Sequence, residues 1–436
     1  MGVFRCDDTS RLRMGPRGGM LMRTTEMNEG AFSGWRMAAL LFVVLNIVLG
    51  INFGSYGALV DAIQKAFGTT RALASAGSSV LTLAMGLLSP LAGALMLRFP
   101  IRLLMMAGAL FSAAGYLLMA HVQSIYAMLA CYALLIGPGF CLIGVIPCTH
   151  VVSNWFISER GKAIGLVNMP IGNMIMPVVA AMMLQSIGLR SVFLCFGVMM
   201  AALVPLLFLL IDHPARVGQL ARSAGIGAVP EAQAARGTPV RLLREPAFWV
   251  MTIGVGVLSA AGLVMITHLA ALAISRGLDL GSASLLLAVQ GMAGVAGAPL
   301  FGWIADRIGG AKAFAILSLA QIPPWLGLVL AGANFPVLLA LSIPVGLCCN
   351  GILTLFGTLT AEWLGRDRVG IGMGMSYLFQ VPLIFAAAPM AGIIFDMSGS
   401  YDGAIYIHTA SFVMIGLLFL IYRPVTASDP AGAARG

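Results

Sequence analysis

Charged residues are almost absent from the body of this chain and are concentrated in short joints. Between Trp35 and Tyr422 the sequence is a succession of apolar stretches about 20 residues long, and nearly every Lys, Arg, Asp and Glu falls between them. About 20 apolar helical residues cross the hydrocarbon core of a bilayer. Only helices and closed barrels satisfy their backbone hydrogen bonds in lipid, and stretches of this length favour helices. The sequence therefore predicts an all-α membrane protein.

The composition agrees with a membrane protein and argues against a nucleic-acid binder. The 436 residues are 60% hydrophobic and 9% charged, whereas soluble domains carry about 25% charge. The net charge is +9, but a nucleic-acid binder gathers its Lys and Arg on one face, and here they are spread over alternate joints. The seven cysteines show neither metal-ligand spacing nor a pairing framework. We expect the lipid bilayer as a partner, no nucleic acid, no metal and no cofactor.

Twelve candidate membrane spans follow from the apolar stretches. A polar stretch rich in Gly and Pro separates the first six from the last six, which predicts two six-helix bundles joined by a linker. The spans are residues 36–60, 74–97, 101–120, 125–152, 163–186, 190–212, 246–275, 283–305, 311–331, 335–361, 371–395 and 402–422. The predicted domains are a disordered tail at 1–35, bundles at 36–212 and 246–423, a linker at 213–245 and a second tail at 424–436.

The positive charges predict the orientation of these spans. An even number of spans places both termini on one side, and the tails and joints of that side hold 21 of the 25 Lys and Arg residues. Positive charge accumulates on the cytoplasmic side of membrane proteins. We therefore expect both termini and the linker in the cytoplasm, with the chain in the cell (inner or plasma) membrane.

The two halves repeat each other at a nearly constant offset. Pro90-Leu-Ala-Gly93 with Arg98 matches Pro299-Leu-Phe-Gly302 with Arg307, 209 residues later. Asn154-Trp-Phe matches Glu362-Trp-Leu at an offset of 208, and Gly165 matches Gly374 at 209. Parallel six-helix repeats are typical of secondary transporters, which bind substrate between the halves near the middle of the membrane.

The motifs in this repeat resemble those of the major facilitator superfamily. Gly302-Trp-Ile-Ala-Asp306-Arg307-Ile-Gly309-Gly-Ala-Lys312 is similar to the signature loop between helices 8 and 9 of that family. Asn154-Trp155-Phe156, Arg160-Gly161-Lys162-Ala163 and Thr267-His268-Leu269 resemble the monocarboxylate-transporter and oxalate:formate-antiporter branch. The resemblance implies alternating access, a cavity lined by helices 1, 4, 7 and 10, and cytoplasmic signature loops that act as gates.

Six charged residues at the predicted cytoplasmic ends are candidate gate residues. The resemblance suggests that Asp306 docks on the start of helix 5, near Arg160. A carboxylate is stabilised at a helix N-terminus by the helix dipole. The alternative for each charge is a solvated loop residue that contributes little energy. The candidates are Asp306, Arg307, Glu159, Arg160, Asp367 and Arg368.

Neutral polar residues within the spans are the candidate substrate contacts. Such groups need a partner or a wet cavity, and contacts between helices are the alternative role for each. His268 is the ionisable side chain that we place inside the cavity, where it would suit coupling to a proton or donate to substrate. The candidates are Asn52, Tyr56, His268, Gln290, Asn350, Tyr377 and Gln380.

The sequence also departs from the family pattern. Leu97 stands where the first-half signature usually has Asp, and Gly294 and Ala298 stand where monocarboxylate transporters carry a charged pair on helix 8. Loss of that pair weakens the case for proton coupling and for carboxylate recognition, which is strongest with Arg or Lys.

Three functions follow as hypotheses. The leading one is a secondary active transporter of small organic anions such as monocarboxylates, coupled to a proton or a counter-substrate. The second is a carrier or exporter of neutral or amphipathic molecules, which an uncharged cavity favours. The third is a membrane sensor that no longer transports. Because no metalloprotease, acyl-transfer or phosphate-loop motif occurs, we expect no catalytic residues and no enzymatic activity.

Overall fold

The computed structural model describes residues 33–157, 159–214 and 239–422, and within these ranges the chain is helical with no β-strand. Eleven helical segments in the described ranges are long and apolar enough to cross a membrane. The predicted all-α membrane fold is thus confirmed. The first predicted tail up to residue 32, the whole of the second tail and most of the predicted linker lie outside the described residues.

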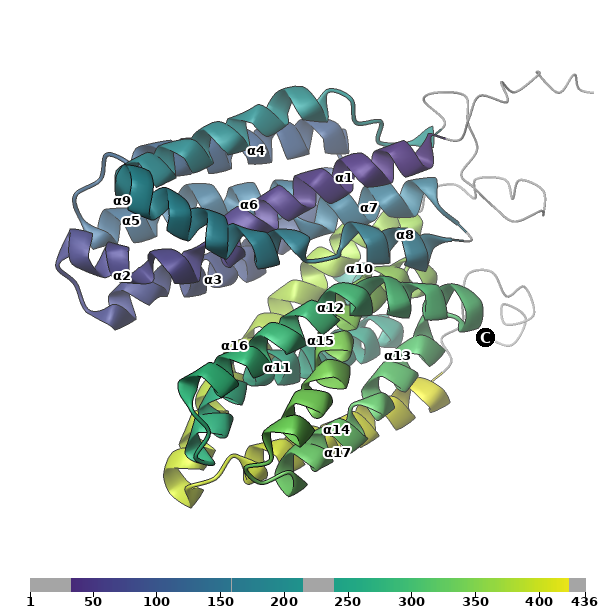
Figure 1. Ribbon diagram of the computed structural model, residues 1–436. Helices are drawn as coiled ribbons and strands as arrows, with labels where there is room; N and C mark the ends of the chain where they lie inside the picture. The colour runs from purple at the N-terminus through teal and green to yellow at the C-terminus, as the bar shows by residue number, and fades with distance from the viewer. Residues whose placement is uncertain (1–32, 158, 215–238, 423–436) are drawn as a thin grey trace, which may run out of the picture.

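The first half of the chain packs as one bundle (Figure 1). Its elements are α1 (Gly34–Leu49), a π-helical turn η1 (Gly50–Gly54), α2 (Tyr56–Phe67), α3 (Arg71–Met96), α4 (Ile101–Met119), α5 (Ile125–Cys131), a second π-helical turn η2 (Tyr132–Ile136), α6 (Gly137–Ile143), α7 (Val145–Trp155), α8 (Arg160–Val167) and α9 (Ile171–Leu207).

The second half packs as another bundle (Figure 1). It begins after the short helix α10 (Pro239–Leu242) and contains α11 (Pro246–Ser275), α12 (Leu280–Ile308), α13 (Gly310–Ala320), α14 (Ile322–Leu330), α15 (Phe335–Trp363), a 3₁₀ turn η4 (Arg366–Arg368), α16 (Val369–Ser398) and α17 (Asp402–Ile421).

The first apolar span ends at Val60, as the sequence predicts, but the helix continues beyond it. α1, η1 and α2 follow one another to Phe67, whereas the apolar pattern ends at residue 60. The wide turn η1 carries Gly54, where a Cβ would lie 2.9 Å from the Asn173 Cα atom of α9. A glycine is needed for this close packing of two helices. Gly68 then ends α2 with a φ of 58°, a left-handed conformation that suits glycine.

The fifth and sixth predicted spans form a folded-back pair. Helical residues run from Arg160 to Leu207, which is 48 residues, and one straight helix of that length would measure about 70 Å. Gly188, with φ 76° and ψ 166°, breaks α9 where the sequence predicts a joint between spans. Asn168 and Pro170 form an earlier break between α8 and α9. Eleven segments, one of them double, are consistent with the twelve predicted spans.

The two bundles converge at one end of the molecule and diverge toward the other (Figure 1). α3 packs against α16, and α8 packs against α12 and α15. We call the converging end, where α8 begins and α12 ends, the closed end, and the opposite end, where α2 lies, the open end. The faces between the bundles are therefore the region in which to seek a transport pathway.

Candidate transport pathway between the two bundles

Small residues allow α8 and α12 to cross at close range. A Cβ on Gly165 would lie 2.5 Å from the Ala298 carbonyl oxygen, and a Cβ on Gly302 would collide with the Gly161 carbonyl oxygen. Backbones of two helices approach this closely only where side chains are absent or minimal. Close backbone packing therefore closes this part of the interface.

Asp306 joins the two bundles at this crossing. It lies in the last turn of α12, and its carboxylate oxygens accept hydrogen bonds from the backbone N–H groups of Gly161 at 2.6 Å and Lys162 at 2.7 Å. These N–H groups have no partner within their own helix, and the positive end of the helix dipole adds to the attraction. The carboxylate of one bundle thus caps the first turn of a helix in the other.

A second ionic contact lies beside it. The Arg160 guanidinium is 3.5 Å from a Glu362 carboxylate oxygen, so this pair also joins the two bundles. Glu362 in turn accepts two hydrogen bonds from the Gly310 N–H, at 2.9 and 3.1 Å, which caps α13. Asp306 and Arg160, both predicted gate residues, are therefore brought together at the closed end.

The remaining candidate gate residues occupy different positions. Arg307 stacks on the Trp303 ring of its own helix, with its guanidinium carbon 3.9 Å from the ring centroid. Arg368 pairs with Glu245 at 2.6 Å inside the second bundle. Glu159 precedes α8 at its N-cap. Asp367 lies in η4, which packs against α7 of the first bundle.

The crossing of α3 and α16 corresponds, in the internal repeat, to the crossing of α8 and α12. The Ser89 hydroxyl donates to the Gly374 carbonyl at 2.7 Å, and a Cβ on Gly93 would lie 2.6 Å from the Gly370 carbonyl oxygen. Leu97, which matches Asp306 in the repeat, is largely exposed and offers no acceptor. Only the α8–α12 crossing therefore carries a carboxylate cap among the described residues.

Two candidate substrate residues are engaged inside the first bundle. The Tyr56 hydroxyl donates to the Ala74 carbonyl at 2.7 Å and accepts from the Gly77 N–H at 3.0 Å. The Asn52 amide donates to the Val48 carbonyl and accepts from the Tyr116 hydroxyl at 3.1 Å. Both side chains are buried, and these bonds hold the helices of the bundle together.

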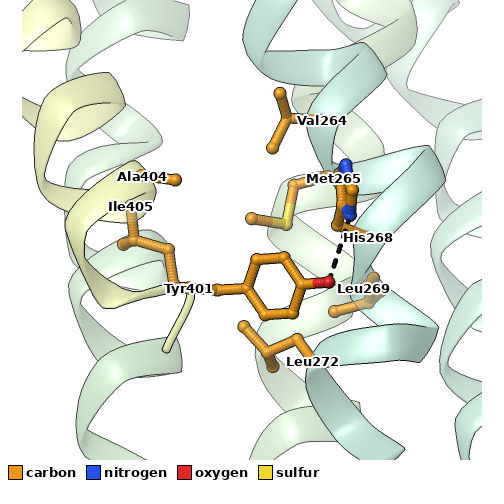
Figure 2. Close-up of a pocket in the computed structure, with 8 residues that line it drawn as sticks. All are labelled: Val264, Met265, His268, Leu269, Leu272, Tyr401, Ala404 and Ile405. Carbon is orange, nitrogen blue, oxygen red and sulfur yellow. Dashed lines mark hydrogen bonds between the residues drawn. The ribbon is translucent and has the colours of Figure 1, made fainter. Parts of the chain in front are cut away.

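His268, which is half-buried, lines a small pocket between α11 and α17 of the second bundle (Figure 2). Its Nδ1 lies 3.3 Å from the Tyr401 hydroxyl, and the walls are apolar side chains such as Met265 and Ile405. Burial raises the pKa of Tyr401, so its phenol stays protonated and can donate to the imidazole. The structure thus places His268 beside a neighbouring helix of its own bundle.

The other four candidates lie on α12, α15 and α16 of the second bundle. Gln290 points its amide nitrogen at the Cys349 sulfur, 3.9 Å away, and leaves its buried carbonyl oxygen without a partner. The Asn350 amide packs against Gly294, and the Tyr377 ring contacts Phe356 edge-on with centroids 5.4 Å apart. A separate chain of hydrogen bonds runs from Gln380 through Ser376 to Thr252 and joins α16 to α11.

The sequence reasoning missed Asn168, which ends α8 at the break before Pro170. It is buried, and neither the amide nitrogen nor the amide oxygen has a hydrogen-bond partner. The available signal was an Asn two residues before a Pro inside an apolar span. The same reasoning selected Tyr56, whose hydroxyl is occupied by Ala74 and Gly77, because partners distant in sequence are not visible in a pattern.

Comparison with known proteins supplies the family. The sequence model of the Major Facilitator Superfamily matches residues 41–331 and 269–436. The chain belongs to the Major Facilitator Superfamily. The recognition made from the signature loop is therefore confirmed, and with it the expectation of a membrane transporter rather than an enzyme.

Several members of the superfamily are similar over most of their length. Monocarboxylate transporter 13 of Bos taurus is 24% identical over 91% of this chain and 89% of its own. Monocarboxylate transporter 11 of Homo sapiens is 27% identical over 89% and 81%. The oxalate:formate antiporter of Oxalobacter formigenes is 23% identical over 65% and 66%.

Solved structures of superfamily members share the fold. The proton:xylose symporter XylE superposes with a TM-score of 0.72 at 12% identity, covering 90% of this chain and 96% of its own. The transporter FucP in its outward conformation superposes with a TM-score of 0.70 at 16% identity, covering 89% and 99%. At these identities the likeness describes the architecture of this superfamily member and nothing finer.

Proposed function

We propose that this protein is a secondary active transporter that works by alternating access and carries small organic acids of the monocarboxylate type. The observation that carries the proposal is the Asp306 carboxylate of one bundle bound to two backbone N–H groups of the other. Contacts of this kind hold one end of the pathway shut and are broken when the bundles tilt. The divergence at the opposite end completes the arrangement (Figure 1).

The charge distribution assigns a side to each end. The joints at the closed end carry most of the Lys and Arg residues, which supports a cytoplasmic location for that end and for both termini. The arrangement is then outward-facing, with the cytoplasmic gate shut. Asp306 and Arg160 act as the main gate residues in this proposal, and the membrane is the cell (inner or plasma) membrane.

The substrate class rests on the relatives and on the neutral groups between the bundles. Relatives named as monocarboxylate transporters and as an oxalate:formate antiporter support a small acid, moved with a proton or against a counter-substrate. Gln290, whose buried carbonyl oxygen has no partner, is together with Asn350 and Tyr377 a favoured substrate contact in this proposal. Asn52, Tyr56, His268 and Gln380 then act mainly by supporting their own bundles.

A carrier of neutral or amphipathic molecules is the second candidate. It is favoured by Gly294 and Ala298, which replace the charged pair that monocarboxylate transporters carry on helix 8. The third candidate is a sensor, which differs from both because it would bind its ligand without counterflow.

Counterflow in proteoliposomes tests the proposal. Vesicles loaded with unlabelled formate, acetate, lactate or oxalate, and in parallel with matched alcohols, are diluted into labelled solute. We expect transient accumulation of label with the acids, and loss of accumulation when Gly302→Trp wedges α8 away from α12. Accumulation of alcohols alone would support the second candidate. Binding of an acid without counterflow would support the sensor and contradict transport.

A further inference from the structure

Asn168 faces the second bundle. One turn earlier on α8, Ile164 approaches Gly357 of α15, where a Cβ would lie 3.5 Å from two of its side-chain carbons. Gly165, the next residue, packs against Ala298 of α12. At 3.6 residues per turn, Asn168 lies between these two directions, about 40° from Ile164 and about 60° from Gly165 around the helix axis. Its side chain is therefore directed at the groove between α12 and α15.

Thr354 occupies the matching position on the other side. It precedes Gly357 by three residues on α15, so both side chains lie one turn from the Ile164–Gly357 contact and both lie toward the open end. Thr354 is 0% exposed and Asn168 is 3% exposed. The Thr354 hydroxyl and both amide atoms of Asn168 have no hydrogen-bond partner.

This level is also where the interface between α8 and α12 ends. Gly291 lies seven residues before Ala298, on the same face of α12 and two turns nearer the open end. A Cβ on Gly291 would meet no atom within 4 Å, whereas Ala298 is in contact with Gly165. Asn168, one turn beyond Gly165, thus lies at the boundary between the sealed and the open part of the pathway.

The internal repeat marks the same level in the other crossing. Asn168 follows the crossing glycine Gly165 by three residues, and Tyr377 follows the matching glycine Gly374 by three. The duplication therefore places one polar side chain at this boundary in each crossing. Of these two side chains, Asn168 has two polar atoms that are both buried and without a hydrogen-bond partner.

The unpartnered atoms indicate which ligand they fit. A buried amide or hydroxyl without a partner is costly, so a ligand that bonds to it is favoured. The Asn168 amide offers a donor and an acceptor side by side, and the Thr354 hydroxyl offers either. A carboxylate can only accept hydrogen bonds, so the lone pairs of one of its oxygens would face those of the Asn168 carbonyl oxygen. A protonated carboxyl group supplies one donor and one acceptor, which matches the amide.

We propose that Asn168 and Thr354 bind the carboxyl group of the substrate in its undissociated form. This inference rests on the proposed transport of small organic acids and deepens it. The ligand reaches the pair as α8 and α15 separate, so its binding favours the state in which the closed end is opening. The proton crosses the membrane on the substrate, and transport is electroneutral without a titrating protein side chain.

Binding measurements on the purified protein test the proposal with two probes. Propionate is titrated at pH 6 and pH 7, and propionamide, which carries a donor and an acceptor at every pH, is titrated in parallel. The neutral fraction of propionate falls about tenfold over this unit, so its apparent Kd should rise about tenfold. The Kd of propionamide should not change, which controls for titration of the protein itself.

Variants separate a binding role from a packing role. Asn168→Leu should weaken both probes by about tenfold or more, and Thr354→Val, which keeps the shape, should weaken them in the same direction. The matched control is Gln321→Leu, which removes another buried amide with two unpartnered atoms at the break between α13 and α14. It should leave both affinities unchanged.

Two results would overturn the inference. One is a propionate affinity that does not change with pH, and the other is an Asn168→Leu protein that is folded and binds both probes like the wild type. If Asn168→Leu does not fold, Thr354→Val carries the same prediction. Counterflow of the wild type reports separately on the proposed function, because an acid can be transported without using this pair.

Discussion

The Asp306 carboxylate joins the two bundles through two short hydrogen bonds. Asp306 caps Gly161 and Lys162, and such a charge at a helix N-terminus is worth about 0.3–1 kcal/mol, or up to about 2 when partly buried. Asp306→Asn removes the charge and keeps one acceptor. We expect the closed end to open about 2 to 30 times more often.

The measurement is alkylation from the cytoplasmic side of Thr149→Cys, in a chain whose native cysteines are replaced by alanine. Thr149 lies behind the gate, where its methyl group faces Gly357. Asp279→Asn is the matched control, because Asp279 caps the far end of α12 by accepting from the Ser282 N–H at 3.0 Å. Equal labelling of the two variants would contradict a gating role for Asp306.

At the scale of helices, the crossings depend on glycine. Gly302→Ala places a methyl group against the Gly161 backbone, and overpacking of this kind costs about 1–3 kcal/mol. α8 and α12 should separate, and Thr149→Cys should become more accessible from the cytoplasm. Gly291→Ala is the control on the same helix, since its methyl group meets no atom within 4 Å. A Gly302→Ala protein that labels no faster than Gly291→Ala would rule out this packing as the seal.

The second crossing contributes independently. Ser89→Ala removes the hydrogen bond to Gly374, a loss of about 0.5–1.5 kcal/mol. Ser89 and Asp306 share no partner, so their effects on the opening equilibrium should add in the double variant. Labelling of Thr149→Cys in the two single variants and the double variant measures this. A double variant that opens no more than one single variant would show that the crossings do not act separately.

At the scale of the whole molecule, the orientation in the membrane decides whether the closed end faces the cytoplasm or the outside. Lys65 and Lys312 are exposed at opposite ends of their bundles. With the proposed orientation, an impermeant thiol reagent applied to intact cells should label Lys65→Cys and not Lys312→Cys, and inverted vesicles should give the reverse. The chain without added cysteines is the background control. The opposite pattern would make the structure inward-facing and would reverse the roles of the two ends.

Much of this architecture is visible in the sequence because it depends on local chemistry. Twenty consecutive apolar residues specify a membrane helix whatever its neighbours are. The positions of Lys and Arg between the helices likewise predict the orientation without knowledge of the tertiary structure. The repeat and the signature loop indicate two related bundles with Asp306 at their junction. The apolar pattern did not reveal that α2 continues beyond the first span, through the more polar residues before Phe67.

The sequence by itself determined that the chain crosses the membrane repeatedly, and it indicated two related halves whose spans carry neutral polar residues. Only the tertiary structure decided which of those groups are occupied: Tyr56 bonds to a carbonyl 18 residues away, and Ser89 bonds to one 285 residues away. It also decided that Asn168, which the sequence does not single out, is buried with both amide atoms unbonded. The physical reason is that hydrophobicity is a property of each residue by itself. Whether a polar group has a hydrogen-bond partner depends instead on which residues folding brings together.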